Sequence, residues 1–134
     1  MQLHTAGLLF IKNKKLLLAF SKNKQCFYLP GGKVDENETA SQALCREIEE
    51  ELHVSLTDDD LEYYTHITAK AFGEDTGVVM EQDCFFVRKQ INPLPGAEIE
   101  TIRFFTLAEY LEQDTQAPGA VLILEQLTAA GLLQ

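Results

Sequence analysis

The segment from residue 39 to residue 54 limits the fold most, because it has the spacing of a helix while its neighbours have the composition of strands. Its apolar residues recur every three or four positions, as on one face of a helix: Ala40, Ala43, Leu44, Ile48 and Leu52. Thr39 or Asn37 can cap the start, and we expect the helix to end near His53. The flanking residues are rich in β-branched and aromatic types, which favour strands. This order predicts a mixed α/β fold.

Strand patterns occupy much of the remaining chain. They cover residues 3–11, 15–20, 26–29, 61–72, 78–88 and 102–105. A polar turn at residues 12–14 separates the first two strands, and residues 73–77 form a predicted hairpin loop. Pro30-Gly31-Gly32 is expected to end the third strand sharply and to begin a loop.

Two further helices are predicted after the last strand, at residues 107–113 and 119–133, with Pro118 suited to the start of the second. The chain has 134 residues, of which 46% are hydrophobic. That size and composition are sufficient for one compact core and leave little room for a second domain. We therefore expect a single domain that spans residues 1–134.

The composition argues against several kinds of partner and compartment. A formal net charge of −10 opposes binding to a nucleic acid polymer. No apolar run approaches the ~20 residues of a membrane span, and the first residues lack the basic start of a signal peptide. The three cysteines, Cys26, Cys45 and Cys84, form no CxxC pair and are interpreted as reduced thiols. These features predict a cytoplasmic protein that binds neither membranes nor nucleic acid polymers.

Three carboxylates share one face of the helix predicted at residues 39–53. Glu47, Glu50 and Glu51 stand at positions i, i+3 and i+4, so their side chains are neighbours on the helix surface. Like charges at this spacing repel one another unless a cation lies between them. Oxygen ligands of this kind suit Mg²⁺, with Mn²⁺ as an alternative. A solvated acidic helix face is the simpler interpretation of the same residues.

The loop before this helix favours the metal-site interpretation, because loop and helix together resemble the Nudix box. The matching residues, in the order and spacing of the box, are Gly32, Glu38, Arg46, Glu47, Ile48, Glu50, Glu51 and Val54. From average residue usage, eight matches at fixed spacing arise by chance in roughly one chain per million of this length. His53 departs from the pattern, since the family has a glycine there that suits a left-handed helix end.

The resemblance implies a fold and an activity. Nudix hydrolases have an α/β/α sandwich with a mixed β-sheet, and the order of predicted elements is similar to it. They hydrolyse the pyrophosphate bond of a nucleoside diphosphate linked to another moiety, with divalent cations that activate water for attack at phosphorus. The resemblance therefore implies a magnesium-dependent pyrophosphohydrolase that acts on a small nucleotide-like substrate. A homodimer is compatible with it.

The resemblance also assigns roles to particular residues. The metal ligands would be Glu47, Glu50, Glu51 and the backbone carbonyl of Gly32. Arg46 would hold a box carboxylate in place rather than contact the substrate. Many family members supply another acidic residue from a later loop, a few residues before an aromatic strand. Glu98 occupies such a position and is the candidate for an additional metal ligand or the general base. Glu38 would support the loop or the metal shell.

Several other residues are candidates with an equally simple structural explanation. Acidic alternatives to Glu98 are Glu100, Glu81 and Asp83, and a surface glutamate remains an interpretation of Glu98 itself. His4 and His66 lie in predicted strands without an evident catalytic partner. The aromatic residues that could stack a base or fill the core are Phe27, Tyr28, Phe85 and Phe86. The lysines that could contact phosphate are Lys22, Lys24 and Lys33. Cys45 is interpreted as a small buried apolar residue.

Three functions remain open at the level of sequence. The first is the hydrolase, and the three box glutamates favour it. The second is a Nudix-fold module that binds a nucleotide without cleaving it. The third is a structural acidic domain, which requires the spacing of the whole box to be accidental. The sequence does not choose among nucleoside triphosphates, dinucleoside polyphosphates, ADP-ribose and nucleotide sugars.

Overall fold

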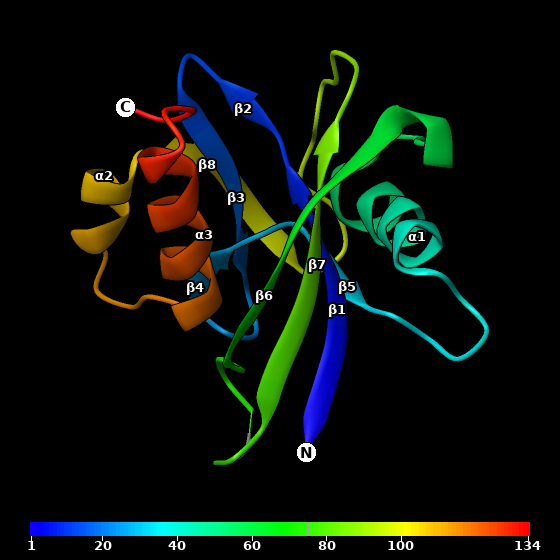
Figure 1. Cartoon of the computed structure of the whole chain (residues 1–134), viewed down its shortest axis with the longest axis horizontal. Coiled ribbons are helices and arrows are strands. Elements are labelled where there is room, and N and C mark those ends of the chain that lie inside the picture. Colours follow the sequence, from blue (N-terminus) through cyan, green and yellow to red (C-terminus); the bar gives the residue numbers. More distant parts are fainter. Residues whose placement is uncertain (75) are drawn as a thin grey trace.

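Two β-sheets packed between helices form the centre of the protein (Figure 1). The structure, a computed structural model, describes residues 1–74 and 76–134. Its elements are β1 (Gln2–Leu9), β2 (Ile11–Lys12), β3 (Lys15–Ser21), β4 (Cys26–Tyr28), β5 (Gly31–Lys33), α1 (Ala40–Leu52), the 3₁₀ turn η1 (Asp58–Asp60), β6 (Leu61–Lys70), β7 (Val79–Val87), β8 (Ile99–Phe105), α2 (Leu107–Leu111) and α3 (Pro118–Ala129).

The first sheet is mixed and has the strand order β5-β1-β7-β6. Its central pair, β1 and β7, is parallel, whereas β5 and β6 join antiparallel at the two edges. In the second sheet β3 is paired antiparallel on both edges, with β8 on one and with β2 and β4 on the other. The predicted α/β sandwich with a mixed sheet is confirmed, and a separate antiparallel sheet is added to it.

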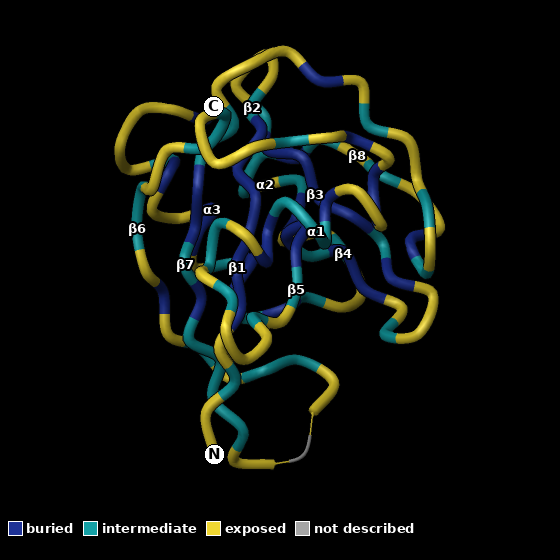
Figure 2. The backbone as a smooth tube through the Cα atoms, turned by 90° about the vertical axis from the view of Figure 1, so that its right-hand side faces the viewer, coloured by how far each residue is buried: buried dark blue, intermediate teal, exposed yellow. Residues whose placement is uncertain are grey.

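Alternating side chains on the strands fill two hydrophobic cores on opposite faces of the mixed sheet. In β1, Ala6 and Leu8 pack into the core that α1 covers, while Leu9 packs into the core that α3 covers. This follows from the two-residue period of a strand. Figure 2 shows the result, with buried strands at the centre and exposed loops around them. The α1 side is closed by the predicted row of Leu44, Ile48 and Leu52, none of which is exposed.

The structure corrects several predicted boundaries. Residues 31–33 were expected to lie in a loop, yet they form β5, because Gly31 and Gly32 pair with Gly7 and Ala6 of β1. The first predicted strand ends at Leu9, and the short β2 follows it. The last two helices end at Leu111 and Ala129, earlier than expected. The predicted hairpin loop at residues 73–77 joins β6 to β7, and its residue 75 lies outside the described residues.

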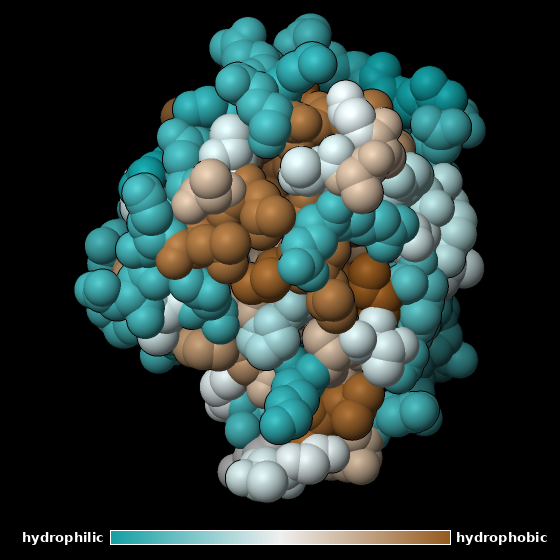
Figure 3. Space-filling view, turned by 60° about the vertical axis from the view of Figure 1, so that its left-hand side comes forward, coloured by the Kyte–Doolittle hydropathy of each residue, from teal (hydrophilic) through white to brown (hydrophobic). Residues whose placement is uncertain are grey.

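Helices α2 and α3 leave apolar side chains at the surface. Figure 3 shows them gathered on the face where these two helices come forward, and Leu111 of α2 and Leu122 of α3 are exposed. No helix in residues 1–74 and 76–134 combines the length and apolar character that a membrane crossing requires.

Candidate active site

A cavity of about 320 Å³ lies beside the glycines of β5, and most of the predicted site residues surround it. Its wall includes Glu47 and Glu51 of α1 and Glu98, which directly precedes β8. Basic side chains also line it, namely Lys24, Lys33 and Lys70. Carboxylates that can hold a cation and lysines that can meet phosphate oxygens therefore share one cavity in a strongly acidic protein.

Local sequence determines how α1 presents its carboxylates. Thr39 caps the helix, since its hydroxyl accepts from the Gln42 N–H at 3.1 Å while the Gln42 side chain accepts from the Thr39 N–H at 2.9 Å. This reciprocal capping box fixes the first turn. The buried row that ends at Leu52 then fixes the rotation of the helix about its axis. As a consequence, the acidic residues of α1 that adjoin this row lie beside the edge strand β5, with which α1 is in contact.

Glu51 is a buried carboxylate with one hydrogen bond. Its side chain reaches the edge of the sheet, where Oε1 accepts from the Gly31 N–H at 3.0 Å, and the residue is only 6% exposed. Burial raises its pKa to about 8, and the negative charges of Glu47, Glu98 and Glu50 act in the same direction. The ionised form of a buried carboxylate among other carboxylates is unfavourable by itself, and a divalent cation beside it makes that form favourable.

The second glycine of β5 makes room for Glu47. A Cβ atom on Gly32 would lie 2.5 Å from Glu47 Cδ and within 2.8 Å of both carboxylate oxygens. Only a residue without a side chain allows this approach, so the backbone of Gly32 and the Glu47 carboxylate are adjacent. Burial raises the pKa of Glu47. This cradle and the all-oxygen donor set suit Mg²⁺ or Mn²⁺, as the sequence predicts.

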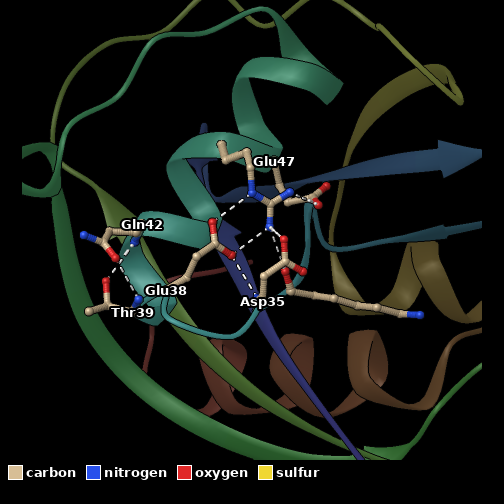
Figure 4. Close-up of polar contacts among 7 residues, drawn as sticks. Asp35, Glu38, Thr39, Gln42 and Glu47 are labelled. Carbon is tan, nitrogen blue, oxygen red and sulfur yellow. Dashed lines mark hydrogen bonds and ion pairs between the residues drawn. The ribbon is translucent and has the colours of Figure 1, made fainter.

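Arg46 ties the loop before α1 to the helix through hydrogen bonds to Glu38 and Glu47, which Figure 4 labels. Its guanidinium donates two bonds to Glu38, from Nε to Oε2 and from Nη2 to Oε1, each 2.9 Å long. A third bond runs from Nη1 to Glu47 Oε1 at 2.8 Å, and Nη2 also reaches the Lys33 carbonyl at 3.1 Å. The predicted role of Arg46, holding a box carboxylate, agrees with these bonds. Among the described residues that line the cavity, Arg46 does not appear.

Glu98 reaches the cavity through a loop that is anchored to the end of α1. Gly96 N–H donates to the Glu51 carbonyl at 2.8 Å, and the Glu98 carbonyl accepts from the Lys22 N–H at 2.9 Å. The Glu98 carboxylate accepts from the side-chain amide of Asn23. The structure thus brings Glu98 to the same cavity as Glu47 and Glu51, although about 50 residues separate them in the sequence.

Other predicted candidates lie elsewhere. Glu50 is exposed and does not line the cavity, and no three described His, Cys, Asp or Glu side chains already form a metal-binding group. His66 bridges Asp83 and Glu81 through its two ring nitrogens, each at 2.7 Å, and His4 contacts Asp83 at 2.9 Å. The hydrogen bond to Asp83 raises the pKa of His66, and the cluster is a hydrogen-bonded network at the surface.

The remaining candidates divide between core and cavity. Phe27 and Phe85 are buried in the two cores, Phe86 packs against one of them, and Tyr28 lines the cavity. Lys24 and Lys33 also line it, whereas Lys22 and Glu100 do not. Cys45 is half-buried, and burial raises the pKa of its thiol.

The sequence interpretation missed Thr5, Lys70, Phe72 and Gln82, all of which line the cavity. Only the strand alternation of Thr5 and Gln82 with core residues signals their position.

Substituting Gly32 tests the contact between β5 and α1. In Gly32→Ala, the added Cβ would overlap the Glu47 carboxylate, so that side chain has to leave its place. We expect the half-saturating Mg²⁺ concentration for turnover to rise about tenfold, because displacing one ligand of a metal site weakens binding by roughly this factor. A metal titration of activity measures it. An unchanged half-saturation point would show that Glu47 need not lie against Gly32.

The helix end at His53 confirms the predicted left-handed conformation, with φ 55° and ψ 37°. Its N–H donates to the Glu49 carbonyl at 3.1 Å, and its ring lies against Gly96. His53→Gly removes the strain of a side chain at positive φ, and we expect about 1 kcal/mol of added stability with unchanged turnover. His53→Ala keeps the strain and removes the ring, so it should be less stable than the parent. Melting temperatures and steady-state rates of both variants measure this. A large loss of rate in His53→Gly would instead assign the imidazole a role in the reaction.

Comparisons with known proteins show the family of this chain. The family model of the NUDIX domain matches residues 1–127. The chain is similar in structure to a MutT NUDIX hydrolase from Burkholderia pseudomallei, with a TM-score of 0.76, 23% identity and coverage of 95% of this chain and 98% of that one. It is also similar to the ORF135 protein of E. coli, with a TM-score of 0.73, 25% identity and coverage of 96% and 92%.

A third similar structure is the NUDIX domain of NrtR from Shewanella oneidensis, which is complexed with ADP ribose. Its TM-score is 0.69 at 20% identity, with 97% of this chain and 88% of that chain covered. A search of curated proteins finds no match. Because the family model extends over nearly the whole chain, this protein belongs to the NUDIX domain family.

Proposed function

We propose that the protein hydrolyses the pyrophosphate bond of a small nucleotide-like substrate and requires Mg²⁺, which Mn²⁺ can replace. The observation that carries the proposal is the convergence of Glu47, Glu51 and Glu98 on one cavity that lysines also line. These carboxylates come from α1 and from the loop before β8. Burial raises the pKa of Glu51, and repulsion from Glu47 and Glu98 adds to this effect. A solvated acidic helix face would not bury a carboxylate to this degree.

The roles proposed for individual residues follow from their positions. The metal ligands are Glu47, Glu50, Glu51 and the backbone carbonyl of Gly32. When bound, the metal neutralises phosphate oxygens and lowers the pKa of water. Glu98, in the loop before β8, lines the same cavity and is proposed as the general base that accepts the proton of the attacking water.

Arg46 is proposed as a positioning residue, because it acts through Glu38 and Glu47. Glu50 is exposed on the face of α1 that carries the other two box glutamates, so its carboxylate is free to turn toward a cation.

The lysines of the cavity are proposed to bind those phosphates of the substrate that extend beyond the metal site. Lys24 lies over the Tyr28 ring at 5.6 Å and 3.7 Å from Glu74, and both contacts keep its ammonium at the mouth of the site. Lys33 follows Gly32 directly in β5, and Lys70 ends β6. Three cations around a polyphosphate offset the repulsion that a net charge of −10 would otherwise impose.

A panel of substrates incubated with the purified chain and Mg²⁺ tests the proposal. The panel contains nucleoside triphosphates, dinucleoside polyphosphates, ADP-ribose and nucleotide sugars, and product analysis locates the cleaved bond. We expect cleavage between two phosphorus atoms for at least one member, and none after the cations are chelated. Undiminished turnover with excess chelator would refute the metal requirement.

The second candidate is a nucleotide-binding module without catalysis. Its support is the NrtR NUDIX domain, a similar structure that is complexed with ADP ribose. The same panel distinguishes the two functions, because a module would bind one of these compounds and leave it intact. We also propose that the protein acts in the cytoplasm, since Cys26, Cys45 and Cys84 are free thiols.

A further inference from the structure

Two polar side chains on the floor of the cavity have no role in the proposed hydrolysis. Thr5 of β1 and Gln82 of β7 are cross-strand partners and are 6% and 7% exposed. Thr5 Oγ1 has no hydrogen-bond partner among the described residues. The side-chain amide of Gln82 makes no hydrogen bond to another described residue. The one side-chain bond that reaches Gln82 comes from Cys84 Sγ, which lies 4.0 Å from the main-chain oxygen of Gln82.

A buried hydroxyl without a partner is rare, and Thr5 Oγ1 is such a group among the described residues. Proteins satisfy nearly all buried polar groups, because a buried group without a partner has lost its hydrogen bonds to water. A valine would occupy the same space as Thr5 without this penalty. Thr5 and Gln82 both line the cavity, so a bound molecule can supply a partner for the Thr5 hydroxyl and for the side-chain amide of Gln82.

The surroundings of this polar pair limit what the molecule can be. The next positions on the same face of the sheet are Leu3 and Met80, which are also cross-strand partners, and Phe72 completes this part of the wall. A ligand here therefore meets apolar surface next to one hydroxyl and one amide, which donate and accept without charge. A nucleobase has this combination of flat apolar faces and an uncharged edge with donors and acceptors.

The distance from Gln82 to the box glutamates also fits a nucleotide. Gln82 lies on the third strand from the edge, since β5 pairs with β1 and β1 with β7. Two strand spacings amount to roughly 10 Å. A compound that contacts both Gln82 and the glutamates beside β5 has to span this distance, and a single phosphate does not.

We propose that Thr5 and Gln82 bind the hydrogen-bonding edge of the substrate's nucleobase and so determine which nucleotide the site accepts. The proposal rests on the proposed function, because it assigns the base of a substrate whose phosphates lie at the glutamates. It makes the two residues specificity determinants with no part in the chemical step.

Binding of AMP, GMP, CMP, UMP and ribose 5-phosphate to the full chain, measured by calorimetry with Mg²⁺, tests this inference. We expect one monophosphate to bind at least tenfold more tightly than ribose 5-phosphate, which lacks a base. Thr5→Val and Gln82→Met should each weaken the binding of that monophosphate about five- to tenfold, which is the effect of losing one neutral hydrogen bond. Binding of ribose 5-phosphate should not change.

A matched control and a second measurement separate recognition from folding. Thr101→Val makes the same substitution at an exposed position in β8 outside the cavity, and it should leave both affinities unchanged. Thr5→Val should also melt at a higher temperature than the parent, because it removes the unpaired hydroxyl. A folded Thr5→Val with weaker nucleotide binding therefore cannot be explained by lost stability.

Three results would overturn the inference: equal binding of ribose 5-phosphate and the monophosphates, an unchanged base preference in both variants, or no binding of any monophosphate at millimolar concentration. The proposed function fails separately. If the base preference depends on Thr5 and Gln82 while no compound of the substrate panel is cleaved, the base site stands and hydrolysis does not. If a substrate is cleaved with the same kcat/KM by parent and variants, hydrolysis stands and the base site does not.

Discussion

Glu51→Gln is expected to lower kcat/KM at least about a hundredfold while making the metal-free protein more stable. The activity falls because a neutral amide replaces a proposed metal ligand, and losing several kcal/mol of charge stabilisation corresponds to a factor of this size. The stability rises because the parent buries a carboxylate whose pKa is about 8. The amide keeps an oxygen that can accept from the Gly31 N–H.

The stability gained in Glu51→Gln should depend on pH. The folded-state pKa of Glu51 lies above its ordinary value of 4.5, so the folded state binds the proton more tightly than the unfolded chain. The contribution of the protonated Glu51 side chain to folding stability is fully present below pH 4.5 and is lost as the pH rises through about 8. At pH 7 the metal-free parent should therefore be less stable than Glu51→Gln by ~2–3 kcal/mol. The difference should vanish below pH 4.5.

Glu50→Gln is the matched comparison on the same helix. It removes a proposed ligand as well, so we expect a comparable loss of activity, but Glu50 is exposed and its neutralisation relieves only weak surface repulsion. Thermal unfolding in EDTA, followed by activity assays with saturating Mg²⁺, measures both effects for both variants. A metal-free Glu51→Gln that is no more stable than the parent would refute the account of Glu51. Full activity in either variant would remove that glutamate from the metal site.

Periodic patterns explain why much of the fold could be predicted from the sequence. Helix α1 was predicted almost to the residue, since its apolar row and its Thr39 cap are local signals. Strand β5 was missed because Pro30, Gly31 and Gly32 have the local chemistry of a turn. Its pairing with β1 is a contact between distant parts of the chain, and no local pattern in three residues reveals such a contact.

The site shows the same division between local and distant information. The spacing of the box placed Glu47 and Glu51 correctly on one helix face, and the arginine contact with a box carboxylate followed from the resemblance. The spacing could not show that Glu51 is buried while Glu50 is exposed, because that depends on the position of the sheet edge. Thr5 and Gln82 look like ordinary strand residues in the sequence. Only the pairing of β1 with β7 places them together on the cavity floor.

Arg46→Lys is expected to lower kcat/KM about ten- to a hundredfold, although arginine and lysine carry the same charge. The parent guanidinium holds both oxygens of Glu38 and one oxygen of Glu47 at once, at 2.8–2.9 Å. A lysine ammonium is a single point of charge and does not form this planar fork. Residues that orient metal ligands affect activity by this factor when they are replaced. Saturating Mg²⁺ should restore part of the rate, because the ligands themselves remain.

The stability of Arg46→Lys should show the same contacts through its pH dependence. The hydrogen bonds from Arg46 hold the pKa of Glu38 at about 2, below its ordinary value of 4.5. A depressed folded-state pKa stabilises the protein above pH 4.5, and this contribution is lost as the pH falls through about 2. The melting temperatures of parent and variant should therefore differ most above pH 4.5 and converge toward pH 2. Arg88→Lys, which alters one exposed ion pair with Glu62, is the control and should change neither rate nor pH profile. Parallel pH profiles for the parent and Arg46→Lys would mean that Arg46 does not determine the ionisation of Glu38.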